Sequence, residues 1–197
     1  MDQALLCARQ AVHSADVPVG ALVLGPDGSI LATGKNQREA HGDPCAHAEI
    51  QAIRAAAQAR GATPSAGTPS AGRGKADGWA ATECGGLGCE PVDGLGPKDL
   101  QGRGQQGSGQ AQGRWRLDGC TLVVTLEPCL MCAGALLAAR LDRLVFGAWD
   151  AKAGACGSVW DLVRDSQSLH QVQVLAGVRE AECAQLLHDF FVSKRSA

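Results

Sequence analysis

The stretch CTLVVTLEPCLMCAGALL, residues 120–137, decides the fold of this chain. Its first part, residues 120–126, is apolar and β-branched, which is typical of a buried central strand. Pro128 suits the start of a helix that follows this strand. Cys129 and Cys132 are three residues apart, so one helical turn would aim both thiolates at one point. The stretch therefore predicts a strand and a helix with a pair of metal ligands at their junction.

A second motif supplies what the cysteine pair lacks. Asp43-Pro44 precedes an alanine-rich run from Cys45 to Arg60, which is a strong helix former. His47 and Glu49 fall in its expected first turn, where the imidazole can bind an ion and the carboxylate can reach a water held beside it. Three zinc ligands and one carboxylate that is not a ligand are the minimum equipment of a hydrolytic zinc site.

The remaining segments alternate between helical and strand patterns. A turn signal at residues 25–28 joins two short apolar runs into a hairpin. The expected elements are helix 4–14, strands 19–24 and 29–33, helix 45–60, strand 120–126, helix 128–140, strand 143–146, short helix 158–164, strand 171–175 and helix 180–192. This order indicates a three-layer α/β domain with a mixed sheet.

Residues 61–112 differ in composition from the rest of the chain. They hold 14 of the 26 glycines and four of the eight prolines, a composition that cannot bury enough apolar surface to offset its ordering entropy. We expect one domain over residues 1–197, interrupted by a flexible Gly/Pro/Gln-rich insertion at the end remote from the zinc motif. Two cysteines in it, Cys84 and Cys89, could bind a second metal, but a linker is the stronger interpretation.

Composition and charge bound the function. A formal net charge of −2 and a pI near 6.2 give no bulk electrostatic case for nucleic acid, so such a partner must be argued from the site. No apolar run approaches the ~20 residues of a membrane span. The chain has nine cysteines, an odd count with two at metal-ligand spacing, which favours a reducing compartment. We therefore expect a cytoplasmic protein without a membrane partner.

The paired motifs carry a family resemblance. His47-Ala48-Glu49 with Pro128-Cys129-x-x-Cys132 is the signature of zinc-dependent base deaminases. Within the cytidine/deoxycytidylate deaminase superfamily, the chain resembles the bacterial tRNA-specific adenosine deaminases. Further stretches that support this branch are residues 17–21, 43–49, 125–135, 146–158 and 183–191.

The resemblance implies a fold, a reaction and partners. The fold would be the three-layer α/β/α deaminase architecture with a central mixed five-stranded sheet. The reaction would be hydrolytic deamination of the wobble adenosine in a tRNA anticodon loop, that of an arginine tRNA, to give inosine. A homodimer with one zinc ion per subunit is also implied.

The same resemblance assigns roles to individual residues. His47, Cys129 and Cys132 would bind zinc, while Glu49 would move protons between water, base and leaving ammonia. In the substrate site, Asn36 would hydrogen-bond the purine and Ala48 would offer a backbone contact. Val19 and Asp150 would line the path of the nucleotide.

Three alternatives stay open at this point. A structural zinc site would be closed by a fourth protein ligand, for which Cys45 is the candidate. A small-molecule deaminase acting on guanine, cytosine or a nucleoside would share the zinc motif and much of the fold. An inactive partner subunit would keep the metal but have little reason to keep Glu49. Without the resemblance, Asn36 is a turn residue by default.

Overall fold

The structure, a computed structural model, describes residues 1–62 and 115–195, which belong to one compact unit. The predicted insertion, residues 61–112, lies outside the described residues apart from the last turn of one helix. Its expected flexibility, the role of Cys84 and Cys89, and the single-domain organisation therefore stay predictions.

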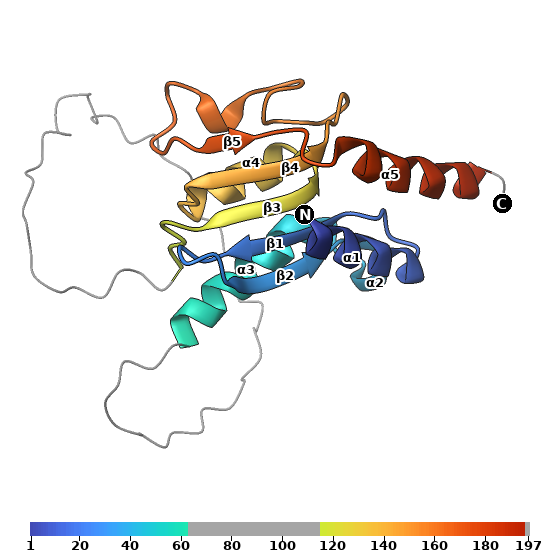
Figure 1. Cartoon of the computed structure of the whole chain (residues 1–197), viewed down its shortest axis with the longest axis horizontal. Coiled ribbons are helices and arrows are strands. Elements are labelled where there is room, and N and C mark those ends of the chain that lie inside the picture. The colour runs from blue at the N-terminus through green and yellow to red at the C-terminus, as the bar shows by residue number, and fades with distance from the viewer. Residues whose placement is uncertain (63–114, 196–197) are drawn as a thin grey trace, which may run out of the picture. The chain divides into compact units, whose positions relative to one another are not determined.

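A mixed sheet of five strands forms the centre of the unit (Figure 1), in the order β2-β1-β3-β4-β5. Strand β1 pairs antiparallel with β2 on one side and with β3 on the other, whereas β3, β4 and β5 are parallel. The strands are β1 (Gly20–Leu24), β2 (Ile30–Lys35), β3 (Thr121–Leu126), β4 (Arg143–Ala148) and β5 (Gln173–Leu175). The predicted mixed five-stranded sheet is confirmed.

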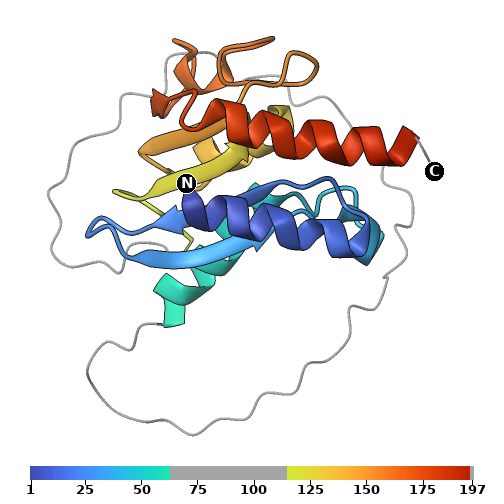
Figure 2. The same cartoon turned by 45° about the vertical axis from the view of Figure 1, so that its right-hand side comes forward.

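Helices cover both faces of the sheet (Figure 2), which completes the predicted three layers. The first face carries α1 (Asp2–Ala11) and α5 (Glu180–Arg195), and the second carries α3 (Ala48–Ala62) and α4 (Leu130–Ala138). None of the helices described is long and apolar enough to cross a membrane.

Two glycines let helices lie close against the two faces of the sheet. A Cβ on Gly20 of β1 would lie 2.9 Å from the Cβ of Cys7 in α1 and closer still to the backbone of that helix. A Cβ on Gly34 of β2 would lie 2.7 Å from the Ala52 nitrogen in α3. Alanine is therefore too large at either position, and the absence of a side chain sets the distance between helix and sheet.

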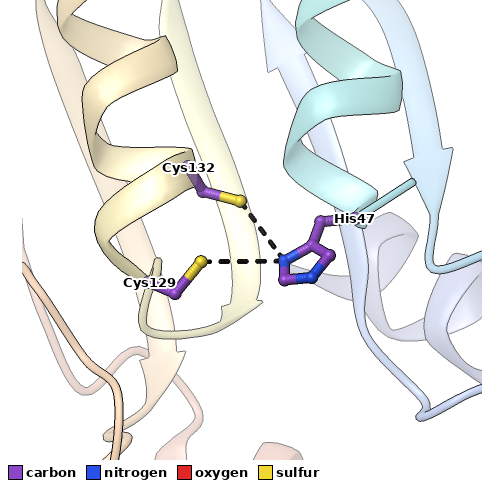
Figure 3. A group of neighbouring side chains, drawn as sticks. All are labelled: His47, Cys129 and Cys132. Atoms are coloured by element: carbon purple, nitrogen blue, oxygen red, sulfur yellow. Dashed lines mark hydrogen bonds between the residues drawn. The ribbon is translucent and has the colours of Figure 1, made fainter. Parts of the chain in front are cut away.

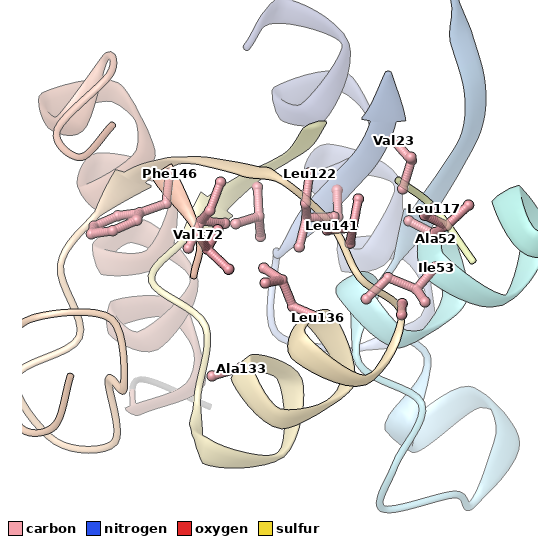
Figure 4. Packing of buried hydrophobic residues seen from close by; sticks show 14 of the residues in the cluster. Val23, Ala52, Ile53, Leu117, Leu122, Ala133, Leu136, Leu141, Phe146 and Val172 are labelled. Carbon is pink, nitrogen blue, oxygen red and sulfur yellow. The ribbon is translucent and has the colours of Figure 1, made fainter. Parts of the chain in front are cut away.

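The core between the sheet and the second helical layer is aliphatic with one large aromatic ring (Figure 4). Leu122 of β3, Leu136 of α4 and Leu144 and Phe146 of β4 are fully buried. Their burial fixes β3 and α4 relative to each other, and these two elements carry the cysteine pair.

The element boundaries correct several predictions. Helix α3 begins at Ala48, not at Cys45, so His47 lies just before the helix. Helix α4 begins at Leu130, and Cys129 is its extended N-cap residue, because the Cys129 carbonyl accepts the bond from Ala133 N–H at 2.8 Å. The predicted helix 158–164 is reduced to a 3₁₀ turn at Leu162–Arg164. A short helix, α2 (Arg38–His41), was not predicted.

Candidate metal and catalytic site

The two halves of the predicted site meet where β3 ends and α3 begins (Figure 3). The Nδ1 atom of His47 lies 3.7 Å from the Cys129 sulfur and 3.5 Å from the Cys132 sulfur. The three donor atoms all lie within 4.8 Å of one another. The two cysteines come from the start of α4 and the histidine from the residue before α3, so residues distant in the sequence converge on one point.

These spacings suit zinc. A tetrahedral ion with Zn–S near 2.3 Å and Zn–N near 2.05 Å places its sulfur and nitrogen ligands about 3.6 Å apart. The two nitrogen-to-sulfur distances here, 3.5 and 3.7 Å, bracket that value. A donor set of one imidazole and two thiols is also the soft, borderline set that zinc prefers. The residues present therefore fit the metal.

The number of protein ligands decides between a structural and a catalytic site. Within residues 1–62 and 115–195, the group that can hold a metal contains His47, Cys129 and Cys132 and no fourth donor. Cys45, the candidate for closing the site, is exposed and stands outside this group. Three protein ligands are the pattern of catalytic zinc sites, which keep one position for water or substrate.

The donor atoms polarise one another. Hydrogen bonds from Cys132 and then from His47 lower the pKa of Cys129 to about 3. The pKa of Cys132 is raised, first by its hydrogen bond to Cys129 and then by burial. The hydrogen bond to Cys129 also raises the pKa of His47. One thiolate is thus favoured before any metal arrives, and metal binding would displace the remaining protons.

Glu49 is close to this cluster without belonging to it. The side chain is buried, with 4% of its surface exposed, in the first turn of α3. Burial raises the pKa of Glu49 to about 7, because removal from water penalises the charged form. A carboxyl group with such a pKa can both accept and donate a proton near neutral pH.

A cavity of about 330 Å³ opens beside the cluster, a size within the range of small-molecule sites. All four predicted substrate-site residues line it, as do His47, Glu49 and Cys129; the four are Val19, Asn36, Ala48 and Asp150. Lys152, which the sequence also offers as a basic residue near an RNA site, lines the cavity too. The remaining wall residues were not predicted, and they are Val17, Arg38, Leu126, Glu127, Ala153, Leu187 and Phe191. Most of them belong to no recognisable motif. Glu127 is the exception, because an acidic residue directly after an apolar strand can indicate a site residue.

Asn36 offers an unused acceptor at this wall. Its side chain is 6% exposed, and its Nδ2 donates to the Val17 carbonyl at 3.2 Å. Its Oδ1 is buried, and no hydrogen-bond partner for it is found in the described part of the chain. Because an unsatisfied buried acceptor costs about 1–3 kcal/mol, this atom is suited to a donor group on a bound ligand. The role of Asn36 in substrate binding stays a prediction, and this unpartnered oxygen supports it.

Comparisons with known proteins agree with this arrangement. The sequence profile of the cytidine and deoxycytidylate deaminase zinc-binding region matches residues 1–69, which include the His47 motif. A profile of MafB19-like deaminases matches residues 105–195, which include both cysteines. The fold and the site thus define a deaminase of the zinc-dependent class, and zinc is the cofactor.

Individual relatives narrow the class. The tRNA-specific adenosine deaminase of Bacillus subtilis is 32% identical over 97% of this chain and 86% of its own length. A solved structure from a study of A-to-I editing by tRNA deaminases at the wobble position has 30% identity and a TM-score of 0.65, covering 94% of this chain and 96% of its own. The chain belongs to the tRNA-specific adenosine deaminase family.

One relative is much longer than this chain. The tRNA(Ile)-lysidine synthase of Deinococcus deserti is 37% identical over 99% of the chain, but the chain spans only 27% of the synthase. The chain thus spans about a quarter of the length of this relative.

Proposed function

We propose that the protein is a zinc-dependent hydrolase that converts the wobble adenosine of a tRNA anticodon to inosine. The observation that carries the proposal is one cavity lined by His47 and Cys129, two members of the donor cluster that Cys132 completes, and by the buried carboxyl of Glu49. Membership of the tRNA-specific adenosine deaminase family supports the choice of substrate.

The proposed chemistry divides the work between metal and carboxyl group. His47, Cys129 and Cys132 would hold the ion. When bound, zinc would lower the pKa of a water molecule towards neutrality and so supply a hydroxide nucleophile for C6 of adenine. Glu49 would take the proton of that water, deliver it to N1 of the ring, and later protonate the departing amine. A C–O bond forms at C6, the C–N bond breaks, and adenosine plus water becomes inosine plus ammonia.

The cavity walls would hold the base in place. The free Oδ1 of Asn36 would accept a hydrogen bond from the purine, and the backbone of Ala48 would contact its other edge. Val19 is an apolar wall against which a ring can pack. Asp150 also lines the cavity, and we assign it to the path of the rest of the nucleotide.

An anticodon loop suits such a cavity better than a duplex. A base inside a stack cannot reach an enclosed site, so the target must be splayed out or flipped. Arg38 and Lys152 line the same cavity and carry positive charge, although the chain as a whole has a formal charge of −2. Two cations at the mouth of the site are where phosphates of a single-stranded loop would be neutralised.

The resemblance further supports an arginine tRNA as substrate, the cytoplasm as location and a homodimer as assembly. An apolar surface beside the site suits a second copy. Leu130 is 45% exposed and follows Cys129. Trp160 is 48% exposed, and its backbone N–H donates to the Gly154 carbonyl at 3.2 Å. Cys129 and Gly154 form a β-bridge, so Leu130 and the backbone of Trp160 both adjoin this bridge. Light scattering of the wild type and of Trp160→Glu tests this assembly, because only the wild type should have the mass of a dimer.

The activity is tested by incubating the zinc-loaded protein with an arginine-tRNA anticodon stem-loop and sequencing the wobble position. Glu49→Ala serves as the matched control, since it keeps all three metal ligands. Inosine with the wild type and adenosine with the variant is the expected result. Turnover of free guanine, cytosine or adenosine in parallel, with an untouched stem-loop, would replace the tRNA proposal with the small-molecule alternative.

A further inference from the structure

Glu127 is a buried carboxyl group without a charged partner. It follows the end of β3, and only 2% of its surface is exposed. Among the residues that the structure describes, no lysine, arginine or histidine forms an ion pair with it. Removing a carboxylate from water costs several kcal/mol unless other groups satisfy its lone pairs. The groups that hydrogen-bond to the Glu127 carboxylate therefore indicate its role in this fold.

Three backbone N–H groups satisfy the carboxylate, and all belong to one loop. The N–H of Asp150 donates to Oε2 at 3.0 Å. The N–H groups of Cys156 and Ser158 both donate to Oε1, each at 3.0 Å. Hydrogen bonds to a charged acceptor are about twice as strong as neutral ones. The carboxylate thus ties the beginning and the end of the loop, residues 150–158, to a single point.

This loop is one wall of the cavity. It supplies Asp150, Lys152 and Ala153 to the lining, and the Asp150 Oδ1 in turn accepts the Lys152 N–H at 2.9 Å. On the other side of Glu127, the chain continues through Pro128 to Cys129. The Ala155 N–H donates to the Pro128 carbonyl at 2.9 Å, beside the bridge between Cys129 and Gly154. Glu127 therefore connects the wall that faces substrate with the segment that holds the metal.

The loop packs closely against the carboxylate at Gly154. A Cβ on Gly154 would overlap with the Glu127 carboxyl group and with the Ser158 hydroxyl. That hydroxyl also donates to the Asp150 carbonyl at 2.8 Å, which closes the loop on itself. A glycine at this position lets the loop fold over the carboxylate, and the carboxylate then holds it there.

We propose that Glu127 is a positioning residue, which fixes the substrate-facing loop at a set distance from the metal ligands and so places Asp150 for the nucleotide. The role in substrate binding rests on the proposed function, whereas the hold on the loop does not. Glu127 donates no proton and touches no reacting atom in this role. Its substitution should act on substrate binding more than on the chemical step.

Glu127→Gln is the direct test. The amide keeps the shape, but it has only one acceptor oxygen, so its NH₂ must face at least one of the donor N–H groups. Thr121→Val is the matched control, because it removes a buried acceptor in β3, the strand that precedes Glu127. This acceptor is the Thr121 Oγ1, which accepts from Arg143 Nε at 3.0 Å. Hydrogen exchange at the amides of Asp150, Cys156 and Ser158 is the first measurement, and zinc content is the second.

In Glu127→Gln we expect at least one of the three amides, the one that faces the new NH₂ group, to exchange about tenfold faster or more. None of the three should change in Thr121→Val, and both variants should keep one zinc per chain. With a stem-loop substrate, KM should rise by about tenfold while kcat changes less. Unchanged exchange at the three amides would overturn the proposal, as would a fall in kcat at constant KM. A protein that holds the loop but edits no tRNA would instead overturn only the proposed function.

Gly154→Ala gives a second route to the same loop. Its new Cβ pushes the loop off the carboxylate without altering Glu127 itself, so the same three amides should exchange faster. This variant keeps the proposal testable even where Glu127→Gln fails to fold. Slow exchange at all three amides in Gly154→Ala would show that the loop is held by something else.

Discussion

Replacing Gly34 with alanine should damage a site that it does not touch. Gly34 lies in β2, behind the first turn of α3, and its missing side chain is what lets that helix approach the sheet. A Cβ there would lie 2.7 Å from the Ala52 nitrogen, about 0.7 Å short of ordinary contact, and it would lie nearer still to the Ala48 carbonyl oxygen. The N-terminal part of α3 must therefore move away from the sheet.

The size of the effect follows from what α3 carries. Ala48 stands between His47 and Glu49, so a shift of the helix start moves a metal ligand and the proton carrier together. Overpacking a buried position costs about 1–3 kcal/mol of folding free energy. A misplacement near 1 Å at a reacting group can cost about 100-fold in rate. We expect Gly34→Ala to lower the folding free energy by about 1–3 kcal/mol and the rate by about 100-fold. The variant should also bind zinc more weakly.

Gly134→Ala is the matched control. Gly134 lies in α4, next to the cysteine pair in sequence, but a Cβ there would meet nothing within 4 Å. Alanine in a helix should stabilise the protein by about 0.5–1 kcal/mol and leave zinc binding and rate unchanged. Urea unfolding, zinc titration and stem-loop kinetics measure the pair. If Gly34→Ala gave the same unfolding free energy, zinc affinity and rate as Gly134→Ala, the account of how α3 is placed would be refuted.

Four other perturbations have definite expected outcomes. Glu49→Ala should keep one zinc per chain and lose about 10²–10⁴-fold in rate, measured by metal analysis and stem-loop kinetics. Removing zinc with a chelator should abolish activity and lower the melting temperature, and added zinc should restore both, as calorimetry can follow. Leu136→Ala, in the core under α4, should cost about 2–5 kcal/mol in urea unfolding. Burial raises the pKa of Asp16, but hydrogen bonds from Ser14 and from the first turn of α2 outweigh it and hold the pKa below the ordinary 3.8. Its stabilising contribution is thus present above pH 3.8 and lost as the pH falls through the lower folded value, so Asp16→Asn should flatten the acid limb of stability against pH.

Much of the fold was readable because its elements have strong local signals. Residues 121–126 are all aliphatic or β-branched, which is typical of a strand covered on both faces, and this strand lies at the centre of the sheet. The alanine run after Glu49 forms a helix on propensity alone. The metal-ligating types were readable because imidazole and paired thiols at helical spacing have few other uses together.

The misplaced boundaries come from contacts that no local pattern encodes. Cys129 is extended because the bridge to Gly154 and the bond from Ala155 hold the chain straight until Leu130. Residues after Ser158 do not form a helix because the Leu162 N–H, which a helix from Ser158 would direct to the Ser158 carbonyl, donates to the Ala155 carbonyl at 3.0 Å instead. The cavity walls contributed by α5 could not be predicted, because they depend on how that helix packs across the sheet.

The pairing of β1 with β3 has a consequence for how activity appears during folding. This antiparallel ladder is where the chain before the insertion meets the chain after it. His47 and Glu49 stand on the first side of the ladder, and both cysteines stand on the second. Among the residues that the structure describes, neither half alone supplies all three members of the donor cluster, and a bound ion would connect the halves across the ladder. Activity should therefore appear only when folding is complete. A nascent or half-unfolded chain should have no catalytic activity.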